Sequence, residues 1–278
     1  MVTVVLGLLA AVSYGLADFA GGVASRRHSA VTVLLYSYPV GAVLMLALLP
    51  LFPGSPDGRV VLFGVLGGAA GLFGVIVLYG LMVVAPMNVI SPVTAVLSAI
   101  VPVVFAVLTG ERPTVAAGVG IAVGVVAVLL VSRTSEDHPH GRIGAGVLGL
   151  ALLAGVGFGA YFIFLARAGN HSGLWPLVIS RWTSALLIVP VAVRRRRVAP
   201  VGGRMLALVV GSGTCDALAN MFFLLASRAG LLSLASVLTS LYPAVTVLLA
   251  VLILREHTSR VQRLGLALAG AAIVLITV

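Results

Sequence analysis

Ten apolar runs, each about as long as a bilayer-spanning helix, fill almost the whole chain and constrain its fold more than any other feature. A transmembrane helix needs about 20 consecutive apolar residues. The runs are Val2–Ala24, Val31–Phe52, Val60–Val84, Met87–Thr109, Thr114–Val131, Ile143–Ala166, Leu174–Val193, Met205–Ser227, Leu231–Leu254 and Arg260–Val278. Short breaks rich in Pro, Gly and Arg separate them. The pattern predicts an all-α polytopic membrane protein with ten transmembrane helices.

The composition supports placing these runs in lipid. Charged residues make up 9% of the 278 residues, against roughly 25% in a soluble domain, so most of the surface must face lipid. All seventeen basic residues are Arg, and most of them lie in the breaks between runs. The net charge of +10 therefore indicates loops at a membrane surface and not nucleic-acid binding. We expect a multi-pass protein of the cell membrane (the inner or plasma membrane), with the lipid bilayer as a partner.

The second half of the chain repeats the first. A constant shift of 145 positions lays Ala85–Val131 over the last fifty residues, and a shift of 144 lays Ala10–Gly15 over Ala154–Gly159. The aligned pairs include Ser91 and Ser236, Thr94 and Thr239, Ala99 and Ala244, Glu111 and Glu256, and Gly120 and Gly265. Low-complexity apolar sequence can align by chance, but the register of Ser, Thr, Glu and Gly argues for a duplication.

Each half holds five runs, and this odd number decides the topology. The second half must enter the membrane from the opposite side, which gives two inverted five-helix repeats around a central cavity. We predict a first repeat over residues 1–131, a polar linker over 132–142 and a second repeat over 143–278. Transporters are often built from such inverted repeats, with a substrate site near the bilayer midplane between them.

The chain resembles the EamA-type family of the drug/metabolite transporter superfamily over essentially its whole length. The resemblance is carried by Leu108-Thr109-Gly110-Glu111-Arg112, Leu241-Tyr242-Pro243-Ala244, Arg255-Glu256, the pairs Tyr14-Gly15 and Phe158-Gly159, and Arg181. It implies two inverted five-helix halves around a central cavity, and export of small metabolites, amino acids or drugs. The first half has Ser98 where the second has Pro243, and Ser37 where the second has Arg181. Any site that depends on these positions should be asymmetric.

Three charged residues lie well inside predicted spans, away from their ends: Asp18, Arg181 and Asp216. A charge at the centre of a span costs about 2.5–3.5 kcal/mol on insertion scales and is a functional candidate by default. Ser212, Asp216 and Asn220 recur every four residues, so they form one polar stripe that must face the bundle interior or water. Tyr14 and Asp18 are also four residues apart and share a helix face.

Within the spans, the single positive charge of Arg181 cannot neutralise the negative charges of both Asp18 and Asp216. We expect Arg181 to pair with Asp216, because their spans are adjacent in the sequence, leaving Asp18 to face the cavity. An unpaired carboxyl group in a low-dielectric environment can exchange a proton near neutral pH, so Asp18 is a candidate proton carrier. The alternatives are that Asp18 reaches headgroups near Arg26 and Arg27, and that the pair of Arg181 with Asp216 is purely structural.

Further candidates for substrate contact are hydroxyl and aromatic side chains. Ser236 and Thr239 lie on the repeated polar stripe of the ninth run, although a hydroxyl in a membrane helix usually bonds its own backbone. Tyr38 and Trp182 occupy equivalent positions in the two repeats and are candidates for a cavity wall, although aromatic residues near a span end often serve as interface anchors. We expect Glu111 and Glu256 to form helix-end ion pairs with the neighbouring Arg112 and Arg255.

The distribution of Arg among the loops and the family resemblance predict different orientations of the chain in the membrane. Loops after odd-numbered runs carry twelve Arg and loops after even-numbered runs carry four, which favours odd loops in the cytoplasm. The resemblance implies that both termini lie inside the cell. The sequence therefore leaves orientation open.

The predicted function is secondary active transport of a small-molecule substrate by alternating access, with protons as candidate coupling ions. The chain has no G-x-x-x-x-G-K-[ST] motif and no Lys to complete one, so the energy must come from an ion gradient or the substrate's own gradient. We expect no metal or other cofactor. The alternatives are an intramembrane aspartyl-type enzyme using Asp18 and Asp216, which lacks the usual flanking residues, and a non-transporting membrane sensor.

Overall fold

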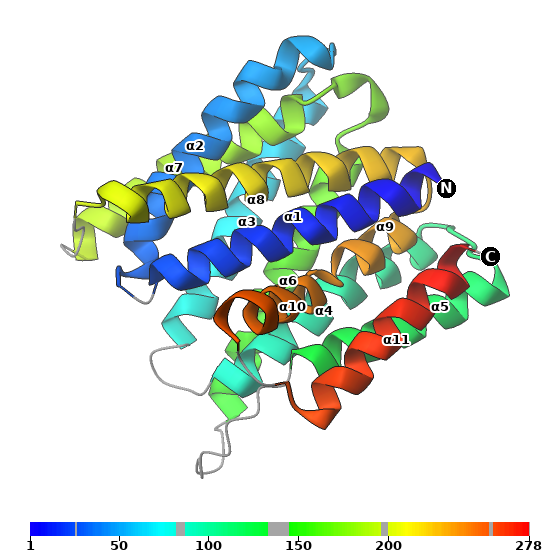
Figure 1. The fold of residues 1–278 in the computed structure, drawn as a ribbon. Coiled ribbons are helices and arrows are strands. Elements are labelled where there is room, and N and C mark those ends of the chain that lie inside the picture. Colours follow the sequence, from blue (N-terminus) through cyan, green and yellow to red (C-terminus); the bar gives the residue numbers. More distant parts are fainter. Residues whose placement is uncertain (26, 82–86, 133–144, 196–199, 256–257, 278) are drawn as a thin grey trace.

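The computed structural model describes residues 1–25, 27–81, 87–132, 145–195, 200–255 and 258–277, and these are helical almost throughout (Figure 1). The α-helices are α1 (Val2–Ser25), α2 (Ala30–Leu48), α3 (Gly58–Leu81), α4 (Met87–Leu108), α5 (Val115–Val131), α6 (Ala145–Arg167), α7 (Trp175–Arg195), α8 (Gly203–Ala229), α9 (Leu232–Thr239), α10 (Tyr242–Leu254) and α11 (Arg260–Thr277). Single 3-10 turns lie at Leu49–Leu51 and Asn170–Ser172. No strand occurs in the described residues, and the predicted all-α class is confirmed.

Within the described ranges, eight helical segments are long and apolar enough to cross a bilayer, with α9 and α10 together counting as one. α4 and α5 supply two shorter apolar segments, Val93–Leu108 and Val115–Val131. The chain is therefore a multi-pass membrane protein. The predicted runs agree with these helices to within four residues at their described ends. Most of the predicted linker, residues 133–142, lies outside the described residues, and the domain boundaries stay a prediction.

The ninth predicted span differs from the structure, because it is broken and not continuous. α9 ends at Thr239, and α10 begins at Tyr242 with Pro243 in its first turn. Pro243 has no N–H to donate to the carbonyl of Thr239, and its ring crowds the preceding turn, so a helix cannot run through this position without distortion. The first half has Ser98 at the equivalent position, and α4 continues through it.

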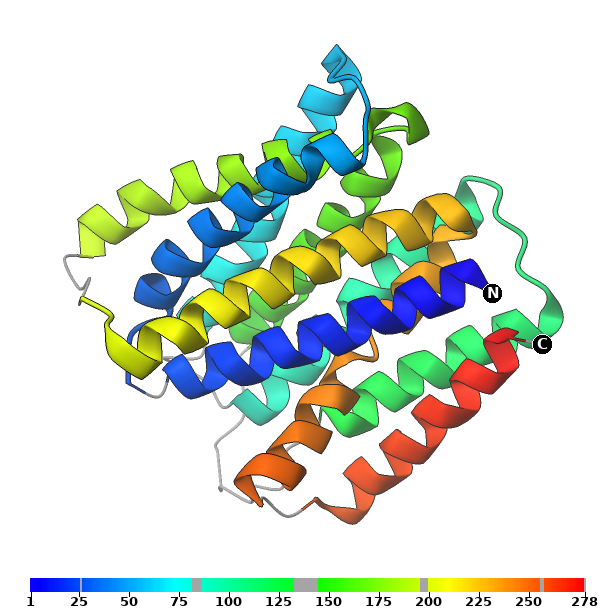
Figure 2. The same cartoon turned by 45° about the horizontal axis from the view of Figure 1, so that its top comes forward.

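Helices of the two halves pack mainly against each other. α1 lies along α8 and α5 lies along α11, as both views show (Figures 1 and 2). Each contact has a counterpart in which the two halves exchange roles. The helices α1, α2 and α3 of the first half correspond to α6, α7 and α8 of the second. The contact of α1 with α8 therefore corresponds to that of α6 with α3, and the contact of α2 with α8 to that of α7 with α3. Both chain termini lie at the same end of the bundle in the two views (Figures 1 and 2).

Close helix approaches at glycine show the same exchange at the level of residues. A Cβ added to Gly15 of α1 would lie 2.5 Å from Cβ of Val245 in α10. In the second half Gly159, the counterpart of Gly15, approaches Val101 at 2.6 Å, one position from Ile100, the counterpart of Val245. The shift of 145 relates the contact of Gly120 with Ile276 directly to that of Gly265 with Val131. Gly68 and Gly213 are also counterparts; Gly68 approaches Ser180, and Gly213 approaches Ser37, whose counterpart is the neighbouring Arg181. This is the pattern expected of two halves related by a two-fold axis.

An aromatic core lies where α1, α6 and α8 meet. The rings of Phe162 and Phe223 are 4.3 Å apart between centroids, and the ring of Tyr14 packs edge-on against Phe162 at 6.3 Å. Large side chains such as Leu165 and Leu224 are fully buried in the same cluster. This packing fixes the depth and rotation of α1 and α8, the two helices that carry most of the polar candidates.

Candidate functional site

The polar stripe of α8 faces the interior of the bundle, as predicted. Leu206 and Val210 are the exposed large apolar residues of this helix. The polar residues of the stripe are more enclosed, since Asp216 is half-buried between the buried Ser212 and Asn220. Ser212 is 8% exposed and Asn220 1% exposed, so neither meets lipid.

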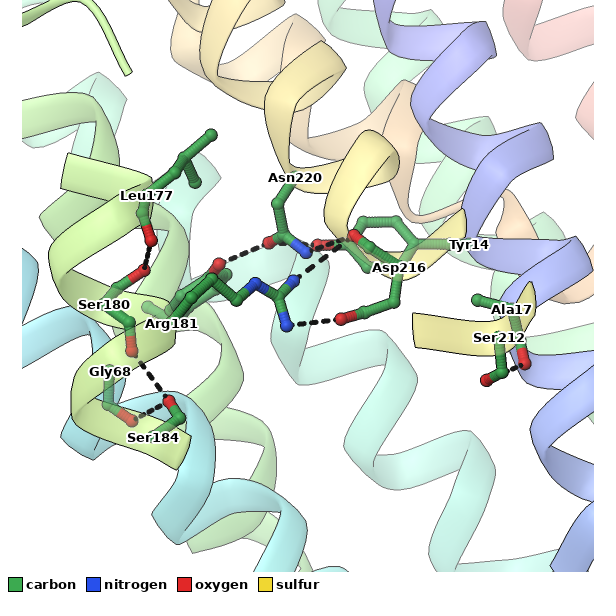
Figure 3. Close-up of polar contacts among 11 residues, drawn as sticks. Tyr14, Ala17, Gly68, Leu177, Ser180, Arg181, Ser184, Ser212, Asp216 and Asn220 are labelled. Atoms are coloured by element: carbon green, nitrogen blue, oxygen red, sulfur yellow. Dashed lines mark hydrogen bonds and ion pairs between the residues drawn. The ribbon is translucent and has the colours of Figure 1, made fainter. Parts of the chain in front are cut away.

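The ion pair expected between Arg181 and Asp216 is present at the centre of this site (Figure 3). Nη1 of Arg181, from α7, contacts Oδ2 of Asp216, and Nη2 donates to the backbone carbonyl of Asp216 at 3.3 Å. Arg181 is 6% exposed, and its guanidinium lies 6.0 Å from the ring centroid of Tyr38, which is itself buried. Nε of Arg181 is buried with no hydrogen-bond partner among the described residues.

Asn220 connects three helices through its side-chain amide. Its Oδ1 accepts hydrogen bonds from the hydroxyl of Tyr14 on α1, at 2.6 Å, and from the hydroxyl of Tyr161 on α6. Its Nδ2 donates to the backbone carbonyl of Asp216 at 2.6 Å. α1, α6 and α8 come from both halves of the chain, so the network joins the repeats.

Tyr161 is a site residue that sequence reasoning missed. It stands in the aromatic stretch Tyr161-Phe162-Ile163-Phe164, where nothing distinguishes a hydroxyl that points inward from a ring that faces lipid. Its position one helical turn after Gly157, which packs closely against α3, is the one signal that places it on an internal face.

Asp18 lies on the inner side of α1 and is nevertheless exposed. The exposed apolar residues of α1 form a stripe on the opposite side of the helix: Val5, Leu9, Val12 and Leu16. The exposed surface of Asp18 therefore borders space between the helices. Among the described residues no cation pairs with its carboxylate, which is close enough to Asp216 for the two charges to repel. The position of Asp18 on the inner side of α1 agrees with the expectation from the sequence, and its role stays a prediction; Arg26, near which the alternative placed it, lies outside the described residues.

Other predicted candidates lie elsewhere. Ser212 donates to the carbonyl of Ala17 on α1 at 2.8 Å, so its hydroxyl ties two helices together. Ser236 and Thr239 are fully buried in α9, and their hydroxyl groups have no hydrogen-bond partner among the described residues. Neither side chain reaches the network around Asn220.

Trp182 follows Arg181 directly but points to a different side of α7. It is 39% exposed and forms one stripe with Leu186, Val189 and Val193, which are also exposed. A stripe of this kind is a lipid-facing surface. Trp182 is therefore not brought together with Tyr38, its equivalent in the first half.

The expected ion pair of Glu111 with Arg112 is wrong. The carboxylate of Glu111 accepts from the backbone N–H of Leu232 at 2.6 Å, from that of Ser233 at 3.1 Å and from the hydroxyl of Ser233 at 2.7 Å. These groups form the start of α9, whose unsatisfied N–H groups favour a negative charge. Glu111 thus caps a helix of the other half. Glu256, its repeat counterpart, lies outside the described residues.

The cluster combines a carboxylate without a partner, an ion pair, an amide and two tyrosine hydroxyl groups. Such a set binds polar or charged groups and can hold a proton. An aspartyl-type catalytic pair would need Asp18 and Asp216 to share a proton, whereas Asp216 here is paired with Arg181. The described residues hold no group of three His, Cys, Asp or Glu placed to bind a metal ion.

Fold and site together define a class: a multi-pass helical membrane protein whose two halves share a cluster of polar groups. The model of the EamA-like transporter family matches residues 1–133 and again residues 145–278. The chain belongs to this family, which is a family of membrane transporters, and it contains two of its repeats. No curated protein matches the chain. A solved structure titled "Crystal structure of protein" is 17% identical and has a TM-score of 0.80 over 99% of this chain and 96% of that one; at this identity the likeness shows the fold alone.

Proposed function

We propose that this protein is a secondary active transporter that exports small polar or amphipathic metabolites, amino acids or drug-like compounds across the cell membrane by alternating access. The observation that carries the proposal is the polar network of Arg181, Asp216, Asn220 and Tyr14, which both halves contribute inside a membrane-spanning bundle. Charged residues at this depth are costly and are kept where they serve a transport path.

The exchanged contacts between the halves support an arrangement of two inverted five-helix repeats around a central cavity. An inverted repeat offers two related conformations, each open to one side of the membrane, as one half rocks against the other. The site is then asymmetric, because Arg181 has Ser37 as its counterpart and the first half supplies no second ion pair there. Substrate would meet Arg181 and Asp216 on one side and Asp18 on the other.

Proton coupling through Asp18 is the mechanism that best fits the charges. Asp18 forms no ion pair with a cation in the part of the chain that the structure describes, borders space inside the bundle and lies near a second carboxylate. Protonation would relieve the repulsion between the two acids, and a cationic substrate group would relieve it equally. Competition between a proton and substrate for one carboxylate produces exchange of the two across the membrane.

The test is transport by the purified protein in liposomes against a panel of metabolites, amino acids and cationic drugs, with and without a pH gradient. We expect movement of at least one compound that a pH gradient drives. The Asp18→Asn variant should lose the dependence on the pH gradient, and Trp182→Phe, on the lipid-facing surface, should retain it. Failure of every compound to move would contradict transport, whereas equal pH dependence in Asp18→Asn would contradict only the coupling mechanism.

A further inference from the structure

An apolar groove of about 360 Å³ runs along the outside of the bundle between α1, α10 and α11. All eleven residues that line it are apolar, and they come from one stripe on each helix. The groove and the network around Asn220 lie on different faces of α1, since the groove residues Leu8 and Val12 lie about 120° and about 160° around the helix from Tyr14. It is therefore separate from the candidate functional site.

The residues of α10 that face the groove form one stripe along the helix, and this stripe ends at an exposed arginine, Arg255. Groove residues Leu241, Val245 and Leu248 are followed at the same helical spacing by Leu252 and Arg255. Leu252 is 75% exposed, so the apolar surface continues beyond the groove toward the helix end. Arg255 caps α10 in a left-handed conformation, with φ of 56°, and is exposed.

The stripe of α11 ends in the same way. Groove residues Leu266, Gly270 and Ile273 are preceded at helical spacing by Arg263, which is exposed. α10 ends and α11 begins at the same end of the groove, so the two arginines lie at one mouth. From Arg263 to Ile273 the helix rises about 15 Å, which is half of the roughly 30 Å hydrocarbon core.

We propose that this groove binds one acyl chain of an anionic phospholipid, whose phosphate group is held by Arg255 and Arg263. The length matches a chain that enters from one leaflet and reaches the midplane. Arginine binds phosphate through paired N–H donors, and an exposed cation at the headgroup level attracts anionic lipid. The absence of polar residues from the lining leaves an acyl chain as the chemically fitting occupant.

Gly270 provides a direct way to fill the groove. A Cβ at this position would meet no atom within 4 Å, so a larger side chain has room without disturbing the helices. Gly211 of α8 has equally open surroundings and does not line the groove, which makes it a matched control. Arg112 and Arg204 are exposed arginines outside the groove and serve as controls for loss of charge.

The test is native mass spectrometry of the full-length protein in detergent, titrated with phosphatidylglycerol or with phosphatidylcholine of the same acyl chains. We expect the wild type to bind phosphatidylglycerol about tenfold more tightly than phosphatidylcholine. The Arg255→Gln/Arg263→Gln variant should bind the two lipids equally, and Gly270→Leu should weaken both about tenfold. The Arg112→Gln/Arg204→Gln and Gly211→Leu controls should behave like the wild type.

Equal binding of the two lipids by the wild type would overturn the proposal, as would controls that lose binding as strongly as the groove variants. A second copy of the chain is the competing occupant. A wild-type dimer that carries no bound lipid and that Gly270→Leu converts to monomer would show that the groove is a subunit interface and would also overturn it.

Discussion

Replacing Glu111 by Ala tests whether the end of α4 holds the start of α9 in the other half. The carboxylate accepts three hydrogen bonds from Leu232 and Ser233. Hydrogen bonds between membrane helices contribute about 0.6–1.7 kcal/mol each, and loss of a helix cap costs about 0.5–2 kcal/mol. Glu111→Ala should therefore reduce the free energy of unfolding by about 2–4 kcal/mol. Glu111→Gln, which keeps one acceptor oxygen, should lose about half as much.

The assay is thermal unfolding of the purified protein in detergent, followed by the fluorescence of its two Trp residues. At about 2–4 °C per kcal/mol for a chain of this size, Glu111→Ala should lower Tm by about 5–15 °C. Arg112→Ala is the matched control, because Arg112 is the exposed neighbour in the same turn and should change Tm little. Equal Tm values for the Glu111→Ala and Arg112→Ala variants would refute the capping role.

Three further substitutions follow from the packing and the polar network. Gly68→Ala would place a Cβ 2.4 Å from the carbonyl oxygen of Ser180, so it should lower the free energy of unfolding by about 1–3 kcal/mol. The control is Gly118→Ala, whose added Cβ meets no neighbour and which should be neutral or stabilising in the same thermal assay. Asn220→Ala should cost about 1–3 kcal/mol, because two tyrosine hydroxyl groups lose their acceptor, and an unchanged Tm would argue against the network. Asp216→Asn should abolish transport in liposomes, while a size-exclusion profile like that of the wild type shows that the protein still folds. Full transport activity of this variant would contradict a direct role for the ion pair.

The helices and the central ion pair could be predicted because the membrane imposes strict rules on the sequence. Backbone groups in lipid must be satisfied within helices, so the two ends of each apolar run, where described, lie within four residues of helix ends. Charges in lipid must pair or reach water, so Arg181 and Asp216 could be matched from their positions alone. The four-residue spacing of Ser212, Asp216 and Asn220 then predicted the inner face of α8.

What the sequence did not reveal depends on contacts between distant residues. Glu111 binds backbone N–H groups 121 positions away, and a backbone donor leaves no mark in a sequence. Tyr161 stands among other aromatic residues, so its inward rotation was not visible. Trp182 follows Arg181 but lies 100° further around the helix. The break before α10 has a visible cause in Pro243, but the apolar run through it favoured one continuous span.

Under the proposed alternating access, the polar cluster lies in a water-filled path that opens to each side of the membrane in turn. The chain has a single cysteine, Cys215, so a Cys215→Ser background permits one new thiol at a time. In sealed vesicles we would measure labelling of Asp18→Cys by a membrane-impermeant methanethiosulfonate reagent added to either side, with Leu186→Cys, on the lipid-facing surface of α7, as control. We expect Asp18→Cys to react from both sides and Leu186→Cys from neither. An Asp18→Cys variant as unreactive as the control from both sides would contradict alternating access through the polar cluster.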